Sequence, residues 1–294
     1  MNLLETLNWA THWLERHGIE NPRLDAELLL ARSLNLSREE LYVHLRGSVE
    51  KKEKKNIEEL IRRRISGEPL QYILGHQEFW SIDLRVDSRV LIPRPETELL
   101  VEEAVSILSV TSLGRRPVVL DLGTGSGAIA IALAKEIEDI FLVATDISWN
   151  AVNLARQNAA DVGVSGKIAF AEGDLFDPFR PSEEKDLFDL ILSNPPYIVR
   201  SEMKHLAREV KDYEPGIALD GGEDGLDFYR RIVSQSPAFL RKRGWLLLEI
   251  GQNQEREVTR ALVEGGSFSD PELLQDLAGI KRVVKVQKKC GSRW

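Results

Sequence analysis

Four residues that could orient a nitrogen nucleophile, Asn194, Pro195, Pro196 and Tyr197, directly follow the apolar run "FDLILS", which predicts a buried strand. Proline cannot donate to a sheet ladder, so the strand must end there, but one proline would suffice for that. The side-chain oxygen of Asn194 and the backbone carbonyl of Pro195, which Pro196 restricts, could accept both N–H bonds of a planar NH2 group. Tyr197 offers a flat face for an amide or a base. Two such acceptors would fix a weak nucleophile and stabilise the positive charge that grows on its nitrogen during attack.

A glycine-rich loop, "DLGTGSGAIA", follows an earlier predicted strand and opens a helix. Gly123, Gly125 and Gly127 would let the backbone approach a ligand closely, and the helix N-terminus adds partial positive charge. Asp146 ends the next strand, where a carboxylate can accept hydrogen bonds from both hydroxyls of a ribose. The loop fits a tight turn without a ligand, a dinucleotide site or a site for S-adenosylmethionine.

The two patterns together favour methyl transfer from S-adenosylmethionine. Its methyl sulfonium is already activated, so the protein needs only to present the nucleophile in line. No strong general base is needed, because the N–H proton becomes acidic only as the C–N bond forms. The alternative for the second pattern is a proline-terminated strand with a surface tyrosine, which the glycine loop on the same predicted sheet disfavours.

Predicted strands and helices alternate from Pro117 to the last predicted strand, "KRVVKVQKK". This alternation predicts an α/β fold with a doubly wound, mostly parallel sheet, whose ligands bind at the carboxyl ends of the strands. The predicted strands are "PVVLDLG", "IFLVATDI", "KIAFAEGD", "FDLILSN", "GWLLLEIG" and "KRVVKVQKK". We expect a methyltransferase domain over residues 111–294.

The preceding residues predict a small helical domain over 1–75 and a β-hairpin with a linker helix over 76–110. The pattern of the first helix puts its apolar side chains on one face, Asn21 is a candidate N-cap, and "EKKEKKNIEELIRRRIS" is expected to be a solvated helix. The residues that carry these expectations are Leu3, Leu4, Leu7 and Trp13 on the first helix, Pro22 after the N-cap, and the capping-box pair Ser37 and Glu40.

Composition restricts the class of protein. The sequence has 294 residues, of which 43% are hydrophobic and 29% charged, as in an ordinary globular protein. No apolar run reaches the roughly 18–20 residues that a membrane span needs, and the N-terminus lacks the basic region of a signal peptide, so we expect no membrane association. One cysteine, Cys290, excludes an internal disulfide and favours the cytoplasm, and the five histidines lack metal-ligand spacing, so we predict no metal site. A net charge of −8 disfavours general nucleic-acid binding.

Several motifs together resemble the protein-(glutamine-N5) methyltransferases that act on peptide chain release factors. They are "DLGTGSGAIA", "ATDIS", "SNPPYI", "DGGEDGLDFYRRI", "LLLEIG", "RRISGEPLQYILGHQEFW" and "VLIPRPETELLV". The resemblance covers nearly the whole chain, and the last motif is more specific than Asn-Pro-Pro-Tyr, which base methyltransferases share. It implies the seven-stranded Rossmann-like form of the predicted sheet. It also implies S-adenosylmethionine as methyl donor, S-adenosylhomocysteine as product, and the glutamine of a release factor Gly-Gly-Gln loop as acceptor.

The resemblance also assigns residues. It places the donor on Gly123, Thr124, Gly125, Ser126, Gly127, Asp146, Asp174, Leu175 and Asn194, and the acceptor on the catalytic residues Asn194, Pro195, Pro196 and Tyr197. Leu175 stands where an aromatic residue often follows the acid, so a main-chain contact with the adenine would survive there but ring stacking would not. Arg94, Thr97 and Glu98 are expected near the site, with helix capping and a local ion pair as the alternative. The acids Asp220, Glu223 and Asp224 are interpreted first as a turn and a helix start, and second as part of a substrate loop.

Two other functions remain open at this point. An adenine-N6 DNA or RNA base methyltransferase would flip its base into the same pocket, but the acidic net charge and the lack of a basic insert disfavour it. A non-catalytic module could bind release factors or ribosomes through residues 1–75, but the intact Asn194–Tyr197 sequence disfavours that too. We therefore expect residues 1–75 to recognise the protein substrate of an enzyme.

Overall fold

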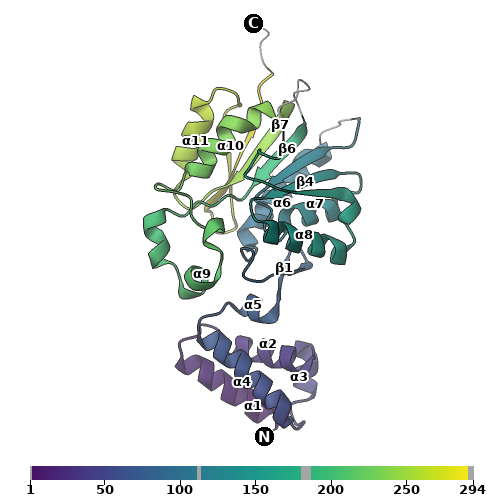
Figure 1. Cartoon of the computed structure of the whole chain (residues 1–294), viewed down its shortest axis with the longest axis vertical. Coiled ribbons are helices and arrows are strands. Elements are labelled where there is room, and N and C mark those ends of the chain that lie inside the picture. The colour runs from purple at the N-terminus through teal and green to yellow at the C-terminus, as the bar shows by residue number, and fades with distance from the viewer. Residues whose placement is uncertain (1, 111–113, 180–186, 291–294) are drawn as a thin grey trace. The chain divides into compact units, whose positions relative to one another are not determined.

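The computed structural model describes residues 2–110, 114–179 and 187–290, which divide between two compact units (Figure 1). The first, the helical unit, comprises Met1–His76 together with Ala207–Tyr213. The second, the sheet unit, comprises Gln77–Leu206 and Glu214–Trp294. The sequence gives no sign that a segment beyond residue 200 belongs with the N-terminal helices.

The helical unit buries one stripe of its first helix. Along α1 (Leu3–Arg16) the buried residues include Leu3, Leu7, Ala10 and Leu14, whose spacing follows the helical period. The expectation that Leu4 and Trp13 share this face is wrong, because they are 41% and 40% exposed. The other helices of this unit are α2 (Pro22–Leu34), α3 (Arg38–Val43), α4 (Lys51–Ile65), α5 (Leu70–Leu74) and α9 (Arg208–Tyr213).

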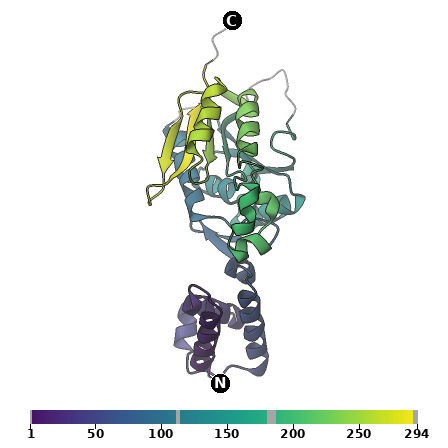
Figure 2. The same cartoon turned by 90° about the vertical axis from the view of Figure 1, so that its left-hand side faces the viewer.

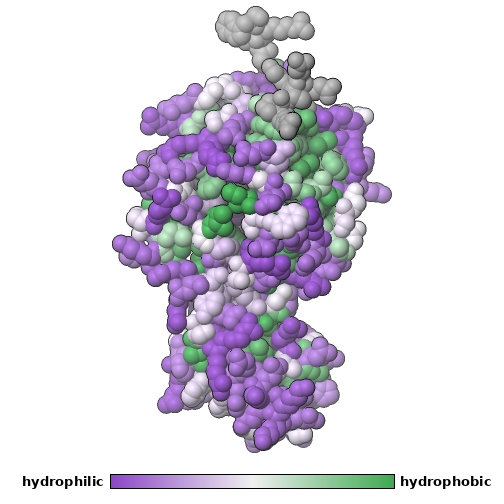
Figure 3. Space-filling model, viewed as in Figure 1, coloured by the Kyte–Doolittle hydropathy of each residue, from purple (hydrophilic) through white to green (hydrophobic). Residues whose placement is uncertain are grey.

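Local capping signals set the helix starts much as predicted. The capping box at the start of α3 is confirmed, since Ser37 Oγ accepts from the Glu40 N–H at 3.1 Å and the Glu40 carboxylate accepts from the Ser37 N–H at 2.7 Å. Asn21 is the N-cap of α2, but its side chain makes no capping hydrogen bond. The surface of the helical unit seen in Figure 3 is mostly hydrophilic, as expected for a solvated charged helix.

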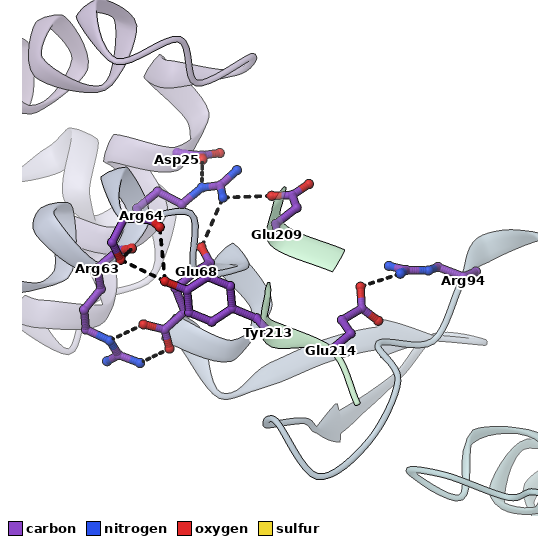
Figure 4. A network of polar contacts seen from close by, with 9 residues as sticks. Asp25, Arg63, Arg64, Glu68, Arg94, Glu209, Tyr213 and Glu214 are labelled. Carbon is purple, nitrogen blue, oxygen red and sulfur yellow. Dashed lines mark hydrogen bonds and ion pairs between the residues drawn. The ribbon is translucent and has the colours of Figure 1, made fainter. Parts of the chain in front are cut away.

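One arginine of α4 departs from that solvated pattern. Arg64 Nε lies 2.7 Å from Asp25 Oδ2, and its Nη1 lies 2.9 Å from Glu209 Oε2 on α9 (Figure 4). The Asp25 carboxylate is buried, so its charge needs such a partner. Tyr213 Oη also donates to the backbone carbonyl of Ser66 at 3.1 Å. These contacts hold α9 within the helical unit.

The sheet unit confirms the predicted α/β class. Its seven strands run in the order β5-β4-β3-β6-β7-β9-β8, and β9 is antiparallel to both of its neighbours, whereas the other pairs are parallel. The antiparallel edge is drawn in yellow in Figure 2. The strands are β3 (Val118–Leu122), β4 (Phe141–Asp146), β5 (Ile168–Glu172), β6 (Phe188–Ser193), β7 (Leu240–Glu249), β8 (Glu272–Gln275) and β9 (Lys281–Gln287). We had not recognised β8, because "ELLQ" is short and lacks β-branched residues.

Helices cover both faces of this sheet (Figure 1). One apolar cluster joins α6 (Glu98–Val110), α7 (Ala128–Glu136) and part of α8 (Trp149–Val162) to strand residues such as Val119 and Leu190. The other joins α10 (Asp227–Gln235) and α11 (Glu255–Glu264) to the neighbouring strand residues such as Leu120 and Ile191. Successive strand residues thus enter opposite clusters, as a sheet buried on both faces requires.

The hairpin predicted within residues 76–110 is present, with two short strands. Its strands are β1 (His76–Phe79) and β2 (Ile82–Arg85). Trp80 and Ser81 form the turn with φ of 54° and 55°, a conformation in which glycine or asparagine is usual. Glu98 Oε1 accepts from the Trp80 N–H at 2.8 Å. Glu98 therefore stabilises a strained turn.

A buried carboxylate fixes the start of the central strand β6. Asp189 accepts hydrogen bonds from Arg115 at 2.8 Å, from Arg241 at 2.7 Å and from the Val118 N–H at 2.9 Å. Burial opposes ionisation, but these donors hold the pKa of Asp189 below its usual value. The carboxylate thereby joins β6 to the starts of β3 and β7, which fixes where the other end of β6 lies.

Candidate active site

Three adjacent strands end in register at one edge of the sheet. Leu122 at the end of β3 lies opposite Thr145 of β4 and Ser193 of β6. The Ser193 hydroxyl also donates to the Leu122 carbonyl at 2.8 Å. The residues that follow or end these strands are Gly123, Asp146 and Asn194, so the two sequence patterns meet at this edge as expected.

A cavity with ≈ 870 Å³ of empty space, part of it open to solvent, lies at this edge. Val90, Ile217 and Phe228 supply further walls. The predicted site residues that line it are Gly123, Gly125, Asp146, Asp174, Leu175, Asn194, Pro195 and Pro196. Thr124, Ser126, Gly127 and Tyr197 are not among its lining residues.

The three glycines of the loop differ in what surrounds them. Gly123 and Gly125 have φ of 71° and 55°, and a Cβ added to either would meet no atom within 4 Å. Such open, side-chain-free backbone fits the close approach of a ligand. At Gly127 an added Cβ would lie 2.9 Å from Ile131 Cδ1 and 3.1 Å from Ala155 Cβ, so this glycine permits close packing of helices. The backbone that is open to a ligand is therefore in the first part of the loop, at Gly123 and Gly125.

The two polar side chains of the loop point into the protein. Thr124 Oγ1 donates to Asp121 Oδ2 at 2.6 Å, and the Ser126 carbonyl accepts from Asn158 Nδ2 at 2.8 Å. Both residues are buried. Burial raises the pKa of Asp121 to about 7, opposed by the Thr124 hydrogen bond. These residues shape the loop from behind.

Asp146 is poised to accept further hydrogen bonds. Its Oδ2 accepts from the Gly125 N–H and its Oδ1 from the Ser148 N–H, each at 2.9 Å. Burial raises the pKa of this carboxyl, while the two N–H groups oppose the shift. Each carboxylate oxygen still has a second lone pair, which can accept from a ligand hydroxyl.

The Asp174–Leu175 turn lies on the same cavity. Leu175 has φ of 51°, unusual for a residue other than glycine, and is only 8% exposed. Its side chain belongs to the same apolar cluster as Phe176. Asp174 forms an ion pair with Arg231 at 2.8 Å. Because the Leu175 side chain packs in this cluster and is aliphatic, the turn offers no ring for stacking at this position.

Behind Asn194 lies a series of buried polar groups, of which the sequence predicted Thr97 to lie near the site but did not indicate Glu249. Asn194 Nδ2 donates to Thr97 Oγ1 at 3.1 Å, and Thr97 Oγ1 donates to Glu249 Oε2 at 2.6 Å. Thr97 is 4% exposed and Glu249 3% exposed. We call these three residues the Asn194–Thr97–Glu249 series. The motif "LIPRPETE" was a signal for Thr97, but its partners lie far away in sequence.

The other two residues singled out in that motif are structural. Arg94 forms an ion pair with Glu214, and Glu214 Oε2 accepts from the Ile92 N–H at 3.2 Å (Figure 4). Glu214 is only 5% exposed. The local ion pair suggested as the alternative is therefore present at Arg94, and Glu98 supports the hairpin turn.

Three glycines allow close approach to the backbone and ring of Tyr197. An added Cβ would lie 2.7 Å from Tyr197 Cα at Gly221, 2.6 Å from its carbonyl oxygen at Gly225, and 2.9 Å from its Cδ2 at Gly251. Gln254 Nε2 also donates to the Tyr197 carbonyl at 3.0 Å. Burial, and next the charge of nearby Glu249, raises the pKa of Tyr197 to about 12. These contacts explain Gly221 and Gly225 of "DGGEDG" and Gly251 of "LLLEIG".

The acids of that motif form turns. Asp220 Oδ1 accepts from the Gly222 N–H at 2.9 Å, and Asp220 pairs with Arg200 at 2.9 Å. Asp224 accepts from the Leu226 N–H at 3.2 Å, just before α10 begins. The interpretation as a turn and a helix start is confirmed for these two residues.

Gly221→Ala tests the close packing around Tyr197. Gly221 does not have a positive φ, so an added methyl group acts through its clashes, with the backbone of Tyr197 at 2.7 Å and with Gly225 Cα at 2.9 Å. We expect a loss of about 1–3 kcal/mol in the free energy of unfolding, the usual cost of overpacking, measured by urea denaturation. The matched control is Gly166→Ala, where no atom lies within 4 Å of the added Cβ. Equal stability of the two variants would contradict the close packing.

Two further searches covered residues 2–110, 114–179 and 187–290. Within these ranges no group of three or more His, Cys, Asp and Glu side chains is placed to hold a metal ion. Nor does any helix within them combine the length and apolarity needed to cross a membrane.

Comparison with solved structures shows a shared fold. A methyltransferase from Pyrococcus furiosus aligns with 71% of this chain and 89% of its own, with a TM-score of 0.51 and 16% identity. The human methyltransferase 10 domain containing protein aligns with 70% of this chain and 88% of its own, with a TM-score of 0.51 and 17% identity. At such identities the likeness concerns the fold alone.

Comparison of sequences shows the family. The PrmC N-terminal domain matches residues 5–75, and the methyltransferase small domain matches residues 97–210. The release factor glutamine methyltransferase of Geobacter sulfurreducens is 44% identical over 95% of this chain and 94% of its own. That of Rhodopirellula baltica is 39% identical over 97% of this chain and 96% of its own. The resemblance seen in the motifs is thereby confirmed, and the chain belongs to the family of release factor glutamine methyltransferases.

Proposed function

We propose that this protein transfers a methyl group from S-adenosylmethionine to the side-chain amide nitrogen of the glutamine in the Gly-Gly-Gln loop of peptide chain release factors. The observation that carries the proposal is that Asn194 and Pro195 line the same cavity as Gly123, Gly125 and Asp146. The relatives are named for glutamine rather than for a nucleic-acid base, which favours the protein acceptor over adenine. Because release factors work on ribosomes, we place the protein in the cytoplasm.

The donor side of the cavity suits an adenosyl group with an amino-acid tail. When bound, S-adenosylmethionine supplies an activated methyl group, and S-adenosylhomocysteine is left as product. We assign Asp146 to the ribose hydroxyls, because both of its oxygens can accept further hydrogen bonds. We assign the open backbone of Gly123 and Gly125 to the amino-acid tail, and the Asp174–Leu175 backbone to the adenine. Thr124, Ser126 and Gly127 would maintain the shape of the loop.

On the acceptor side, Asn194 Oδ1 and the Pro195 carbonyl would each accept one N–H of the glutamine amide. Such bonds strengthen as positive charge develops on the nitrogen, so they stabilise the transition state more than the ground state. Pro196 restricts the conformation of Pro195. We retain the ring of Tyr197 as the flat contact for the amide. The nitrogen gains a bond to the methyl carbon as the sulfur–carbon bond breaks, and one N–H proton leaves to water.

We further propose that the helical unit recognises the body of the release factor. On its first helix the rings of Trp9 and Trp13 lie 6.4 Å apart and those of Trp13 and His17 lie 5.2 Å apart, and Trp9 is partly buried against the apolar core of the unit. Trp13 is 40% exposed. Exposed tryptophans are enriched among the residues that contribute most to protein interfaces.

Asp146→Ala is expected to weaken donor binding. Charge-assisted hydrogen bonds contribute about 1.5–3 kcal/mol, so the dissociation constant should rise roughly 10- to 150-fold. Isothermal titration calorimetry with S-adenosylmethionine measures it. Asp139→Ala is the control, because the Asp139 side chain is 80% exposed. Unchanged affinity in folded Asp146→Ala would refute the assignment.

Asn194→Ala is expected to lower turnover by roughly 10²–10³, the scale for losing one oriented polar group in a transition state. The fold should persist, and donor affinity could fall as well because Asn194 lines the donor cavity. Mass spectrometry of a purified release factor, at saturating donor, measures the rate and identifies the methylated residue. Asn56→Ala on the exposed surface of α4 is the control. Turnover within about threefold of wild type would contradict the role.

Trp13→Ala tests recognition by the helical unit without deleting it. Deletion of residues 1–75 would remove the partners of α9, so its effects could not be assigned to recognition. We expect KM for an intact release factor to rise about 5- to 30-fold, equivalent to about 1–2 kcal/mol, with kcat and donor affinity unchanged. A short Gly-Gly-Gln peptide should react equally poorly with both proteins. Leu277→Ala in the sheet unit is the control, and an equal KM for intact release factor would contradict the role.

A further inference from the structure

The Asn194–Thr97–Glu249 series places a buried carboxyl group behind the proposed catalytic asparagine. The donor–acceptor distances are 3.1 Å from Asn194 Nδ2 to Thr97 Oγ1 and 2.6 Å from Thr97 Oγ1 to Glu249 Oε2. Thr97 and Glu249 do not line the cavity. Because they are also only 4% and 3% exposed, they cannot contact a bound acceptor and can act on it only through Asn194.

We propose that Glu249, acting through Thr97, is the positioning residue that determines which end of the Asn194 carboxamide faces the acceptor amide, and that its protonation state controls the transfer. The inference rests on the proposed function, because it assigns a role to the side chain that would hold the glutamine.

When Glu249 is ionised, the hydrogen bonds of the series can run in only one direction, from Asn194 through Thr97 to Glu249. A carboxylate can only accept hydrogen bonds, so the single hydroxyl proton of Thr97 is donated to it. Thr97 Oγ1 can then only accept from Asn194, and the NH2 end of the carboxamide is the only end that can donate. Since Asn194 also lines the cavity, this orientation leaves its oxygen for the acceptor N–H.

When Glu249 is protonated, the hydrogen bonds can also run in the opposite direction, from Glu249 through Thr97 to Asn194. A carboxyl O–H can donate to Thr97 Oγ1, which frees the Thr97 proton to be donated to Asn194. The carboxamide would then turn its oxygen toward Thr97 and its NH2 toward the acceptor. Two NH2 groups facing one another cannot form a hydrogen bond, so the transition state would lose one of its two acceptors.

The surroundings place this change in an accessible pH range. Burial raises the pKa of Glu249 to about 7, and the hydrogen bond from Thr97 opposes the shift. Among charged groups Glu96 raises this pKa and Arg282 lowers it. Arg282 is itself shared with Asp276 at 3.0 Å, which limits its effect. Three other ionisable groups lie in this region. Arg94 is paired with Glu214, and the hydroxyl of Tyr229 donates to the Glu249 backbone carbonyl at 3.0 Å. The third is Tyr197.

The first experiment measures kcat and KM of the full chain on a purified release factor between about pH 5.5 and 9. The wild-type kcat should fall up to tenfold per pH unit below about 7, as Glu249 becomes protonated. Glu249→Gln should lower kcat by roughly 10-fold or more and lose this acid limb, because glutamine can both donate and accept. Donor affinity and KM should stay within about threefold. Glu257→Gln, on the exposed face of α11, should retain the wild-type profile.

Two substitutions at Thr97 separate positioning from packing. Thr97→Val keeps the shape but removes the hydroxyl, and should lower kcat by roughly 10-fold or more. Thr97→Ser keeps the hydroxyl, and should restore kcat to within about threefold of wild type. Equal losses in Thr97→Val and Thr97→Ser, or an unchanged acid limb in Glu249→Gln, would overturn the inference while leaving the proposed function intact.

A second experiment needs no turnover. The side-chain NH2 resonances of Asn194, assigned by their loss in Asn194→Ala, should shift with pH around about 7 in wild type but not in Glu249→Gln. Wild-type stability relative to Glu249→Gln should also fall as pH rises from about 4.5 to about 7 and level off above that, because between these values the folded state retains the Glu249 proton and the unfolded state does not. If wild type failed to methylate any release factor, the proposed function would fail, and these measurements would still test the series. Resonances that do not titrate would refute it.

Discussion

The site depends on the in-register ends of three parallel strands. Leu122 pairs with Thr145 on one side and with Ser193 on the other, so the loop that follows β3 and the residues that follow β6 emerge side by side. Asp189, at the start of β6, joins that strand to β3 and β7 through a buried carboxylate. A shift of β6 by one residue would reverse which face each of its side chains meets. The position of Asn194 is thus fixed by the register of the sheet.

The residues that follow β6 are held by contacts of a different kind. Behind Asn194 the support is polar, through Thr97 and Glu249, and around Tyr197 it is steric, through glycines that let two backbone segments approach closely. A buried carboxyl group is costly unless it has partners, so a series such as Asn194–Thr97–Glu249 is rarely retained for stability alone. Rigid support of this sort suits catalysis that depends mainly on orienting a weak nucleophile.

The segment after Tyr197 links the two units covalently. It leaves the sheet unit, contributes α9 to the helical unit, where Arg64 and Ser66 hold it, and returns at Glu214. Glu214 is in turn bound by Arg94, from the same motif that supplies Thr97. Ion pairs therefore hold this segment at Glu209, within α9, and at Glu214, where the chain rejoins the sheet unit.

What the sequence determined by itself was local or periodic. The alternation of strands and helices established the sheet, the glycine loop and Asp146 established one end of the cavity, and Asn194 to Pro196 established the other, because each signal lies within a few residues. The tertiary structure alone decided which loop residues face the cavity: Thr124 and Ser126 have types suited to binding, but their side chain and backbone bonds are directed inward. The tertiary structure also decided the role of Thr97, the packing of α9 in the helical unit, and the close backbone approach that the glycines around Tyr197 allow. These features depend on contacts between residues roughly 25 to 150 positions apart in the sequence. Such contacts produce no local sequence pattern from which they could be predicted.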